Sequence, residues 1–244
     1  NAKNEGDLIE PSYVWNQSGG SPITAAASRG HLPIVEYLHW KGADLHVDRE
    51  GPLREAAKGG YLDVFRYLRK SGVDIHYGNE SALCLAASGG HLLLVIELIA
   101  ARANLHVNND EPLYLAAKHG QSDVVRQLLL AGANVHADSN RALIVAVKAG
   151  HAEVVRLLVE RGADVRVNDN EAIRMTGNST LLRHLILAGA EANVSPDEPY
   201  STPLYRAISG GRLEVARLLI IAGAEVRGIS EQLLYAATVH QKGD

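Results

Sequence analysis

Histidine is the residue type whose spacing could most readily do chemistry in this 244-residue chain. His46, His76, His106 and His136 follow one another at intervals of 30 residues. A regular series of imidazoles suggests a metal site, because neutral histidine is a common ligand of zinc. Side chains repeated once per structural unit would lie roughly 8–10 Å apart, however, whereas a zinc–nitrogen bond is about 2.1 Å long. We therefore expect these histidines to face solvent or to bond loop backbone, and we predict no metal ligands.

The other short motifs of catalysis are missing from the sequence. It contains no G-x-S-x-G nucleophile elbow, no phosphate-binding G-x-x-x-x-G-K-[ST] and no zinc-binding H-E-x-x-H. Cys84 follows Leu83 inside a predicted helix, where a small packing residue is expected rather than a reactive thiol. We predict that the protein is not an enzyme and that it binds no cofactor.

The composition argues against further classes of function. Apolar residues make up 46% of the chain, charged residues 21%, and the net charge is −4. The sequence shows no basic excess, so we predict no nucleic-acid partner. Its most apolar stretch, from Leu92 to Ala101, is interrupted by Glu97 and is too short to span a membrane. The single cysteine cannot form an internal disulfide, which favours a reducing compartment.

Two series of glycines reveal an internal repeat. The first has a period of 30 residues and comprises Gly30, Gly60, Gly90, Gly120 and Gly150. The second lies twelve residues further on, at Gly42, Gly72, Gly132 and Gly162, with Arg102 as the one exception. A fixed period of this length is typical of a stacked repeat architecture.

Each repeat is predicted to hold two short helices. In residues 52–71, Pro52 marks the start of the first helix, where its missing N–H costs nothing. Gly59 and Gly60 separate the two helices, and Gly72 ends the second. Helices this short are not stable alone, so they must bury their apolar faces against the next copy. The fold class predicted is an all-α solenoid.

These residues resemble the ankyrin repeat. The match to its Thr-Pro-Leu-x-x-Ala signature is closest at Thr202-Pro203-Leu204 with Ala207, and Ser21-Pro22-Ile23 is similar. The resemblance covers roughly residues 16–241, and it implies stacked ankyrin helix–turn–helix repeats. It also implies that His31, His91 and His151, which precede the second helices, bond loop backbone.

The repeats are shorter than the family norm of about 33 residues. We therefore expect the β-hairpin of the family to be reduced to a tight loop between about residues 43 and 171. Such short repeats are similar to those of large DNA viruses and some protists and bacteria. The sequence starts at Asn1 without a methionine, which leaves open that it is a fragment. We expect the cytoplasm as the location, or the host-cell cytoplasm for a viral or bacterial effector.

The predicted domain organisation has two parts. Residues 1–15 form an N-terminal tail or cap, and residues 16–241 form about seven repeats with a C-terminal capping half-repeat at 230–240. The repeat near 169–195 is irregular, because its first helix has lost three residues, nearly one helical turn. We predict a kink or a change of curvature at residues 175–178.

Four glycosylation-type triplets begin at Asn16, Asn79, Asn178 and Asn193. Asn79 and Asn178 lie at repeat turns, where asparagine is expected for its turn chemistry. We interpret all four triplets as chance occurrences.

The resemblance implies a protein-interaction module that binds its partner through a concave face. That face would consist of the loop tips and the exposed ends of the first helices. The residues carried over to it are Arg29, Arg49, Lys58, Asn79, Ser88, Asn109, Tyr114, Lys118, His119, Arg141, Lys148 and Asp169. Glu50, Glu80, Asp110, Asn140 and Asn170 are also assigned to the loop tips.

Two features of this face suggest how it would bind. Lys58, Lys118 and Lys148 are predicted to form a basic stripe that favours a partner of mixed charge, such as an acidic helix or peptide. Tyr114 is either an aromatic anchor or a buried residue that faces the next repeat. Alternatives for the whole chain are a targeting or regulatory domain of a larger protein and a purely structural spacer. We expect a monomer.

The second helices carry pairs of opposite charge at a spacing of three residues. These are Asp63 with Arg66, Asp123 with Arg126, Glu153 with Arg156, and Glu214 with Arg217. Pairs of this kind contribute only a few tenths of a kcal/mol each, so a solvated outer face is predicted.

Overall fold

The computed structural model describes residues 21–193 and 202–226. Every regular element in these ranges is a helix, so the all-α prediction is confirmed. The chain divides into two compact units, residues 1–104 and residues 105–244. The predicted N-terminal tail or cap at 1–15 and the predicted half-repeat at 230–240 lie outside the described residues.

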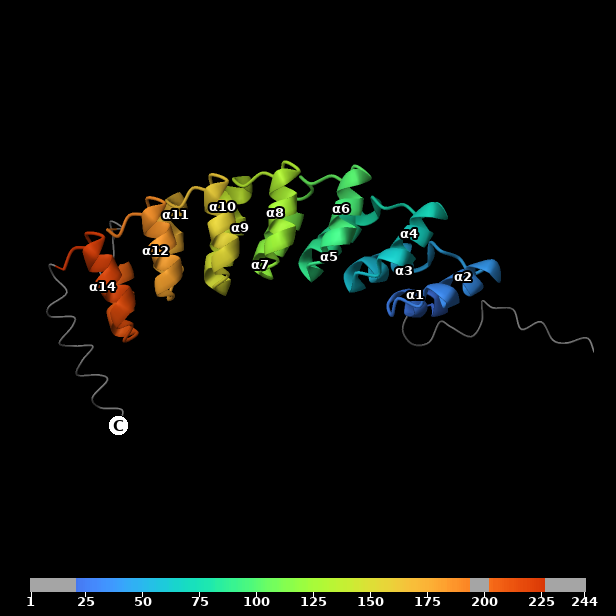
Figure 1. The fold of residues 1–244 in the computed structure, drawn as a ribbon, viewed down its shortest axis with the longest axis horizontal. Helices are drawn as coiled ribbons and strands as arrows, with labels where there is room; N and C mark the ends of the chain where they lie inside the picture. The colour runs from blue at the N-terminus through green and yellow to red at the C-terminus, as the bar shows by residue number, and fades with distance from the viewer. Residues whose placement is uncertain (1–20, 194–201, 227–244) are drawn as a thin grey trace, which may run out of the picture. The chain divides into compact units, whose positions relative to one another are not determined.

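The described part of the first unit, residues 21–104, contains three helix pairs. They are α1 (Pro22–Ala27) with α2 (Leu32–Trp40), α3 (Val47–Gly59) with α4 (Leu62–Lys70), and α5 (Tyr77–Gly89) with α6 (Leu92–Ala100). The first helices α1, α3 and α5 pack against one another in sequence, and α2 packs against α4 (Figure 1). Each pair therefore contributes one first helix and one second helix to the stack.

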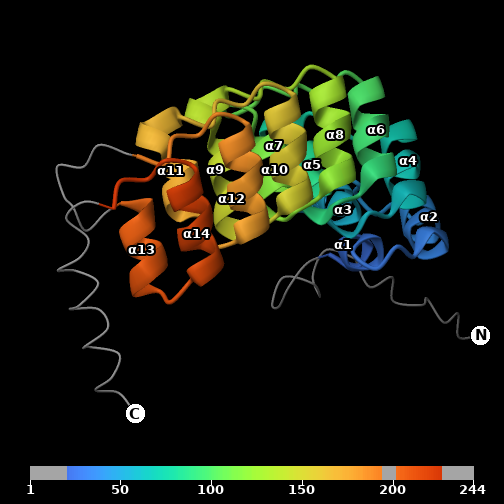
Figure 2. The ribbon, with the colours of Figure 1, turned by 60° about the vertical axis from the view of Figure 1, so that its left-hand side comes forward.

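The second unit repeats this arrangement over residues 105–193 and 202–226. Its pairs are α7 (Glu111–Lys118) with α8 (Ser122–Leu130), α9 (Ala137–Ala149) with α10 (Ala152–Glu160), α11 (Val167–Met175) with α12 (Ser179–Leu187), and α13 (Pro203–Ser209) with α14 (Leu213–Ile221). The first helices contact one another in chain order, and so do the second helices (Figure 2). The helix–turn–helix solenoid predicted from the 30-residue period is therefore confirmed.

The core is made by the same positions in every copy. Leu68 and Leu98 in the first unit, and Leu128 and Leu158 in the second, have no exposed surface. Burial of a leucine side chain contributes about 1.5–3 kcal/mol, and one such residue comes from each of α4, α6, α8 and α10. The alanine pair Ala56-Ala57 is also fully buried, since small side chains let neighbouring first helices approach closely.

A left-handed turn replaces the hairpin that is absent from these short repeats. Three consecutive residues have positive φ at 48–50, 78–80, 108–110, 138–140 and 168–170. Most of them are Asn, Asp or Gly, the residues that tolerate this conformation best. The predicted tight loop is therefore present, and each first helix begins directly after its turn.

The first helix of the irregular repeat ends at the predicted stretch 175–178, and the change of curvature of the stack stays a prediction. The helical part of α9 ends at Gly150 in the left-handed region, whereas α11 stops at Met175 and continues into an extended Thr176. Asn178 then caps α12, since its Oδ1 accepts hydrogen bonds from the backbone N–H groups of Thr180 (2.8 Å) and Leu181 (3.3 Å). Its position in the turn is therefore explained by capping chemistry.

Candidate functional site

Each left-handed turn ends in a buried polar residue, and four of these five residues bond the backbone of the next repeat. These residues are Glu50, Glu80, Asp110, Asn140 and Asn170, which are 5–8% exposed. Glu80 Oε1 accepts a hydrogen bond from the backbone N–H of Asn104 at 2.9 Å. Equivalent bonds join the N–H of Asn134 to Asp110, of Asp164 to Asn140, and of Glu191 to Asn170, at 2.7–3.0 Å.

The assignment of these five residues to an open loop tip was therefore wrong. A backbone N–H that leaves water needs an acceptor, and the side chains of Glu80, Asp110, Asn140 and Asn170 supply one in these part-buried bonds. Only the two residues before it in each turn remain exposed. The 30-residue recurrence of Glu, Asp or Asn at this position was the sequence signal for a structural role.

Three histidines of the loop series contact the carboxylates that end these turns. His46 Nδ1 donates to Glu50 Oε1 at 2.8 Å, His76 donates to Glu80 at 2.8 Å, and His106 lies 3.2 Å from Asp110. The hydrogen bond to Glu50 raises the pKa of His46, because the carboxylate stabilises the imidazolium. Among the described residues, no three His, Cys, Asp or Glu side chains come together as a metal site would require.

The second histidine series bonds backbone, as the family resemblance implies. His91 Nε2 donates to the carbonyl oxygen of Lys58 at 2.8 Å, and His151 Nε2 donates to that of Lys118 at 3.1 Å. The His91 ring lies on the preceding repeat, where a Cβ atom added to Gly60 would approach its Nδ1 to 2.3 Å. Glycine at this helix end thus makes room for the bond between repeats.

The exposed side of the first helices, together with the turns that precede them, is called the first-helix face. Each of the two units has its own first-helix face. Of the predicted residues, Ser88, Tyr114 and Arg141 are half-buried, and the other nine are exposed. Arg49 lies in a turn before a first helix, whereas Lys58 lies near the end of that helix. Nine helical residues span about 13 Å, so the candidates line both rims of this face.

Tyr114 is held by Arg141. The Arg141 guanidinium carbon lies 3.6 Å from the centre of the tyrosine ring. Arg141 Nη1 also donates to Glu111 Oε2 at 3.3 Å, and its Nε lies 3.8 Å from Asp138. Tyr114 is therefore neither fully buried nor an open aromatic anchor, because the guanidinium covers one side of its ring.

The predicted lysine stripe is interrupted at Lys148. Its Nζ lies 2.9 Å from Glu171 Oε1, and the pKa of Glu171 is lowered by this pair. Lys118 makes no ion pair with a described residue of the second unit, and the same holds for Lys58 in the first. The three lysines thus differ in how much uncompensated charge they offer.

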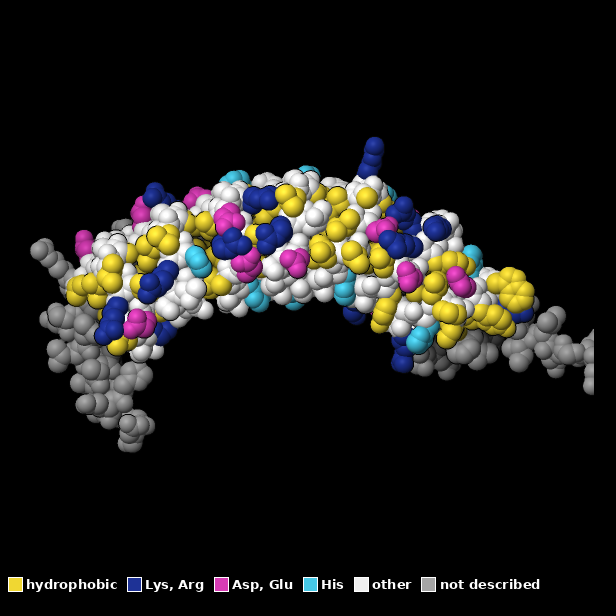
Figure 3. Space-filling model, in the orientation of Figure 1, with side chains coloured by type: hydrophobic (Ala, Val, Ile, Leu, Met, Phe, Trp, Pro, Cys, Tyr) yellow, Lys and Arg dark blue, Asp and Glu magenta, His cyan; other side chains and the backbone are white. Residues whose placement is uncertain are grey.

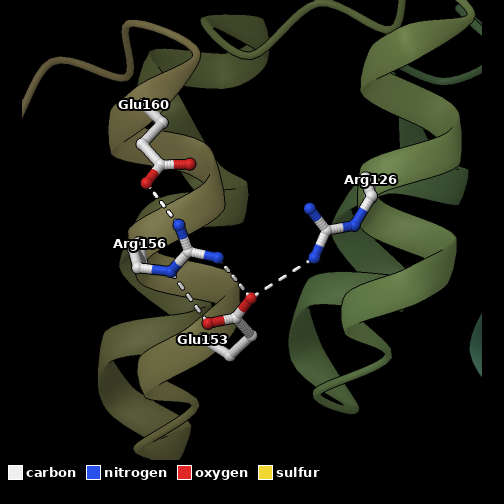
Figure 4. Close-up of polar contacts among 4 residues, drawn as sticks. All are labelled: Arg126, Glu153, Arg156 and Glu160. Atoms are coloured by element: carbon white, nitrogen blue, oxygen red, sulfur yellow. Dashed lines mark hydrogen bonds and ion pairs between the residues drawn. The ribbon is translucent and has the colours of Figure 1, made fainter.

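The outer face carries the surface ion pairs. Figure 3 shows Lys and Arg side chains interspersed with Asp and Glu over the second helices of the second unit. Arg156 donates to Glu153 at 2.6 and 2.9 Å and also to Glu160, while Arg126 reaches Glu153 at 3.4 Å (Figure 4). The pKa of Glu153 is lowered and that of Arg156 is raised by their hydrogen bonds.

Two of the four predicted pairs are therefore confirmed, Glu153–Arg156 and Glu214–Arg217. For the other two predictions, Asp63–Arg66 and Asp123–Arg126, the arginine pairs with a different carboxylate. Arg126 pairs with Glu153 of the next repeat, and Arg66 pairs with Glu97 of the next repeat at 2.5 Å. Neighbouring second helices bring these carboxylates within reach, which spacing along a single helix does not capture.

The comparisons with known proteins agree with this architecture. A family model described as ankyrin repeats in three copies matches residues 6–79 and 83–169, and a single ankyrin repeat matches residues 200–231. The chain belongs to the ankyrin repeat family. The first matched segment begins inside the stretch 1–15 that we expected to be a tail or cap.

The fold is also similar to a solved ankyrin structure. The crystal structure of the human ASB11 ankyrin repeat domain aligns with a TM-score of 0.72 and 22% identity, covering 84% of this chain and 99% of that chain. At this identity the likeness concerns the fold alone. No curated protein matches the chain. Ankyrin repeats generally act as protein–protein interaction modules. Among the described helices of this chain, none is long and apolar enough to cross a membrane.

Proposed function

We propose that this ankyrin stack binds a partner protein through its first-helix face. The observation that supports this is the contrast between buried and exposed positions of the same helices. Ala56-Ala57, Ala86-Ala87 and Ala116-Ala117 are identical and fully buried, whereas the next residues are Lys58, Ser88 and Lys118. Packing fixes the repeated positions and leaves the exposed ones open to variation, as a recognition surface requires.

The residues proposed to carry the contact are the exposed candidates of each unit together with Tyr114 and Arg141. Tyrosine and arginine are enriched among residues that dominate binding energy. In the second unit they are already held together at 3.6 Å, so binding costs little side-chain entropy there. The exposed lysines would chiefly steer the approach of an acidic surface.

Affinity capture from the native cell, followed by mass spectrometry, tests this proposal. We expect a protein partner that is lost when Lys58, Lys118 and Tyr114 are replaced by alanine. The matched control replaces Lys70, Arg161 and Arg183, exposed cations on the second helices or at their ends, and should retain the partner. Equal capture by both variants would contradict binding through the first-helix face.

Two alternatives remain distinct outcomes of this experiment. A structural spacer has no preferred face, so alanine at Lys58, Lys118 and Lys148 would leave every captured protein unchanged. A targeting or regulatory domain would bind its partner through the same face, but as part of a longer gene product with flanking domains. We further propose that the described repeats are monomeric, lie in the cytoplasm and carry no catalytic site.

A further inference from the structure

A row of arginines lies where the irregular repeat meets the last described one. Arg206 Nη1 donates to the carbonyl oxygen of Arg174 at 3.3 Å and lies 3.9 Å from the sulfur of Met175. Arg212 Nη2 donates to the carbonyl oxygen of Arg206 at 3.0 Å. These three residues come from α11, α13 and the turn after α13, so the guanidinium of Arg206 lies at the end of α11 and that of Arg212 at the end of α13.

The lost residues of α11 create this arrangement. In the regular repeats a first helix continues to a glycine, and the ring of His91 or His151 then lies against that glycine. Because α11 stops at Met175, Arg206 bonds a carbonyl oxygen at its end. Arg212 occupies the histidine position of its repeat, and a Cβ atom on Gly177 would approach its Nη1 to 2.3 Å.

Within the described residues, the hydrogen bonds of Arg206 and Arg212 bring no carboxylate to their guanidinium groups. Both donate to neutral carbonyl oxygens, and neither forms an ion pair with another described residue. Glu171, whose pKa is lowered in part by Arg174, is bound to Lys148 at 2.9 Å. Of the described residues named at the end of α11, Lys148, Arg174, Arg206 and Arg212 are thus cations and Glu171 is a carboxylate, in a chain whose net charge is −4.

An apolar side chain, that of Met175, lies beside the Arg206 guanidinium. Met175 is 40% exposed, and methionine adapts to varied apolar surfaces. Arg206 and Arg212 are both exposed, and each arginine has five N–H donors in a planar fork that matches a carboxylate. The surface thus combines free charge-assisted donors with an adaptable apolar contact.

We propose that Arg206 and Arg212, with Met175, bind an acidic peptide segment of the partner through a glutamate or aspartate carboxylate beside an apolar side chain. This inference rests on the proposed function, because it assumes a protein partner, and it names the chemistry of one contact on that face. Each guanidinium keeps its bond to a carbonyl oxygen and directs its remaining donors to the incoming carboxylate. The apolar residue of the peptide contacts Met175.

Fluorescence anisotropy with purified protein tests the contact without the natural partner. The probe is a labelled peptide of about twelve residues that contains Glu and Leu, compared with a peptide in which Gln replaces Glu. We expect the Glu peptide to bind more tightly and to weaken with added salt. Arg206→Gln and Arg212→Gln should each weaken it about tenfold, the loss typical of a charge-assisted hydrogen-bond pair.

Matched controls keep the outcome interpretable. Arg217→Gln and Arg183→Gln remove exposed charges from second helices of the same unit and should leave the affinity within about twofold. Arg206→Lys keeps the charge but loses the fork, so it should bind less tightly than the native chain even when far-ultraviolet circular dichroism shows an intact fold.

Three outcomes would overturn the proposal. The first is that the Gln peptide binds as tightly as the Glu peptide, and the second is that both glutamine variants keep the affinity of the native chain. The third is that an oligothymidylate of the same length binds as tightly as the Glu peptide, which would indicate a general polyanion surface. If the peptide test fails but alanine substitutions on the first-helix face still abolish capture of the cellular partner, the proposed function is retained. If those substitutions have no effect while the peptide binds as expected, the wider proposal fails, and the result shows only that Arg206 and Arg212 bind an acidic peptide.

Discussion

The guanidinium of Arg141 lies over the ring of Tyr114, with its central carbon 3.6 Å from the ring centre. The two residues come from successive first helices, so the contact ties one repeat to the next. A cation–π contact at an exposed site contributes about 0.5–1 kcal/mol. Arg141 also bonds Glu111, and this second bond limits the positions that the guanidinium can adopt.

This contact predicts an energetic coupling between the two side chains. Arg141→Ala and Tyr114→Leu should each lower the free energy of unfolding, and the double variant should lose about 0.5–1 kcal/mol less than the two single losses combined. Chemical denaturation of the four proteins measures the coupling. Arg126→Ala combined with Tyr114→Leu is the control, and it should be additive because Arg126 lies on the outer face and pairs with Glu153. Additivity in both cycles would refute the contact.

The histidines before the second helices predict a difference between equivalent positions. His91→Ala removes the hydrogen bond to the Lys58 carbonyl oxygen and should cost about 1 kcal/mol in the free energy of unfolding. His31→Ala should cost much less, because the His31 ring makes no hydrogen bond within the described residues. Urea denaturation compares the two variants, and equal losses would show that the bond between repeats contributes little.

The buried acceptors of the left-handed turns predict which substitutions are tolerated. Glu80→Ala leaves the backbone N–H of Asn104 without its charged acceptor and should cost about 1–3 kcal/mol. Glu80→Gln keeps an acceptor oxygen and should cost clearly less, because Asn140 and Asn170 already do the same task without a charge. Hydrogen exchange at the Asn104 amide reports the bond directly. Protection that survives in Glu80→Ala would contradict this role.

The sequence predicts the architecture well because packing imposes it on every copy. The period of 30 residues, the alanine pairs and the helix-ending glycines together establish two helices per repeat and the break after Met175. Each of these signals depends on contacts that recur at the same interval, so one chain carries several independent copies of the same information.

The individual roles of polar residues could not be predicted in the same way. Glu50 and Arg49 are neighbours in one turn, yet Glu50 is buried and Arg49 is exposed. The left-handed turn determines which of the two side chains is buried, and the polarity of the residues alone does not reveal it. The partners of Arg66 and Arg126 were missed for a related reason, since the competing carboxylates come from another repeat.

The His46–Glu50 pair predicts a pH dependence with a defined direction. The pKa of His46 is raised above its ordinary value of 6.5 by the hydrogen bond to Glu50. A raised folded-state pKa contributes stability that is fully present below about pH 6.5 and is lost as the pH rises through the folded-state pKa. The imidazole side chain is 55% exposed, so solvent screening keeps this contribution small.

Nuclear magnetic resonance titration of the His46 ring measures this effect. In Glu50→Gln the acceptor remains but the negative charge is gone, so the His46 pKa should fall toward its ordinary value. The stability gained at acidic pH should fall with it. An unchanged His46 pKa in the variant would assign the shift to another group, such as Asp44, whose charge also raises it.

The left-handed turns predict that Arg49 destabilises its repeat. Its φ is +58°, a conformation that costs most residues roughly 1–2 kcal/mol and costs asparagine less. Arg49→Asn should therefore raise the free energy of unfolding by up to about 1 kcal/mol. Asn109 has the same φ of +58° in another turn and is also exposed, so Asn109→Arg should lower stability by a similar amount. Thermal denaturation of this reciprocal pair checks the argument. Backbone strain predicts that Arg49→Asn stabilises the protein and that Asn109→Arg destabilises it, whereas self-repulsion in a chain of net charge −4 would give the reverse signs.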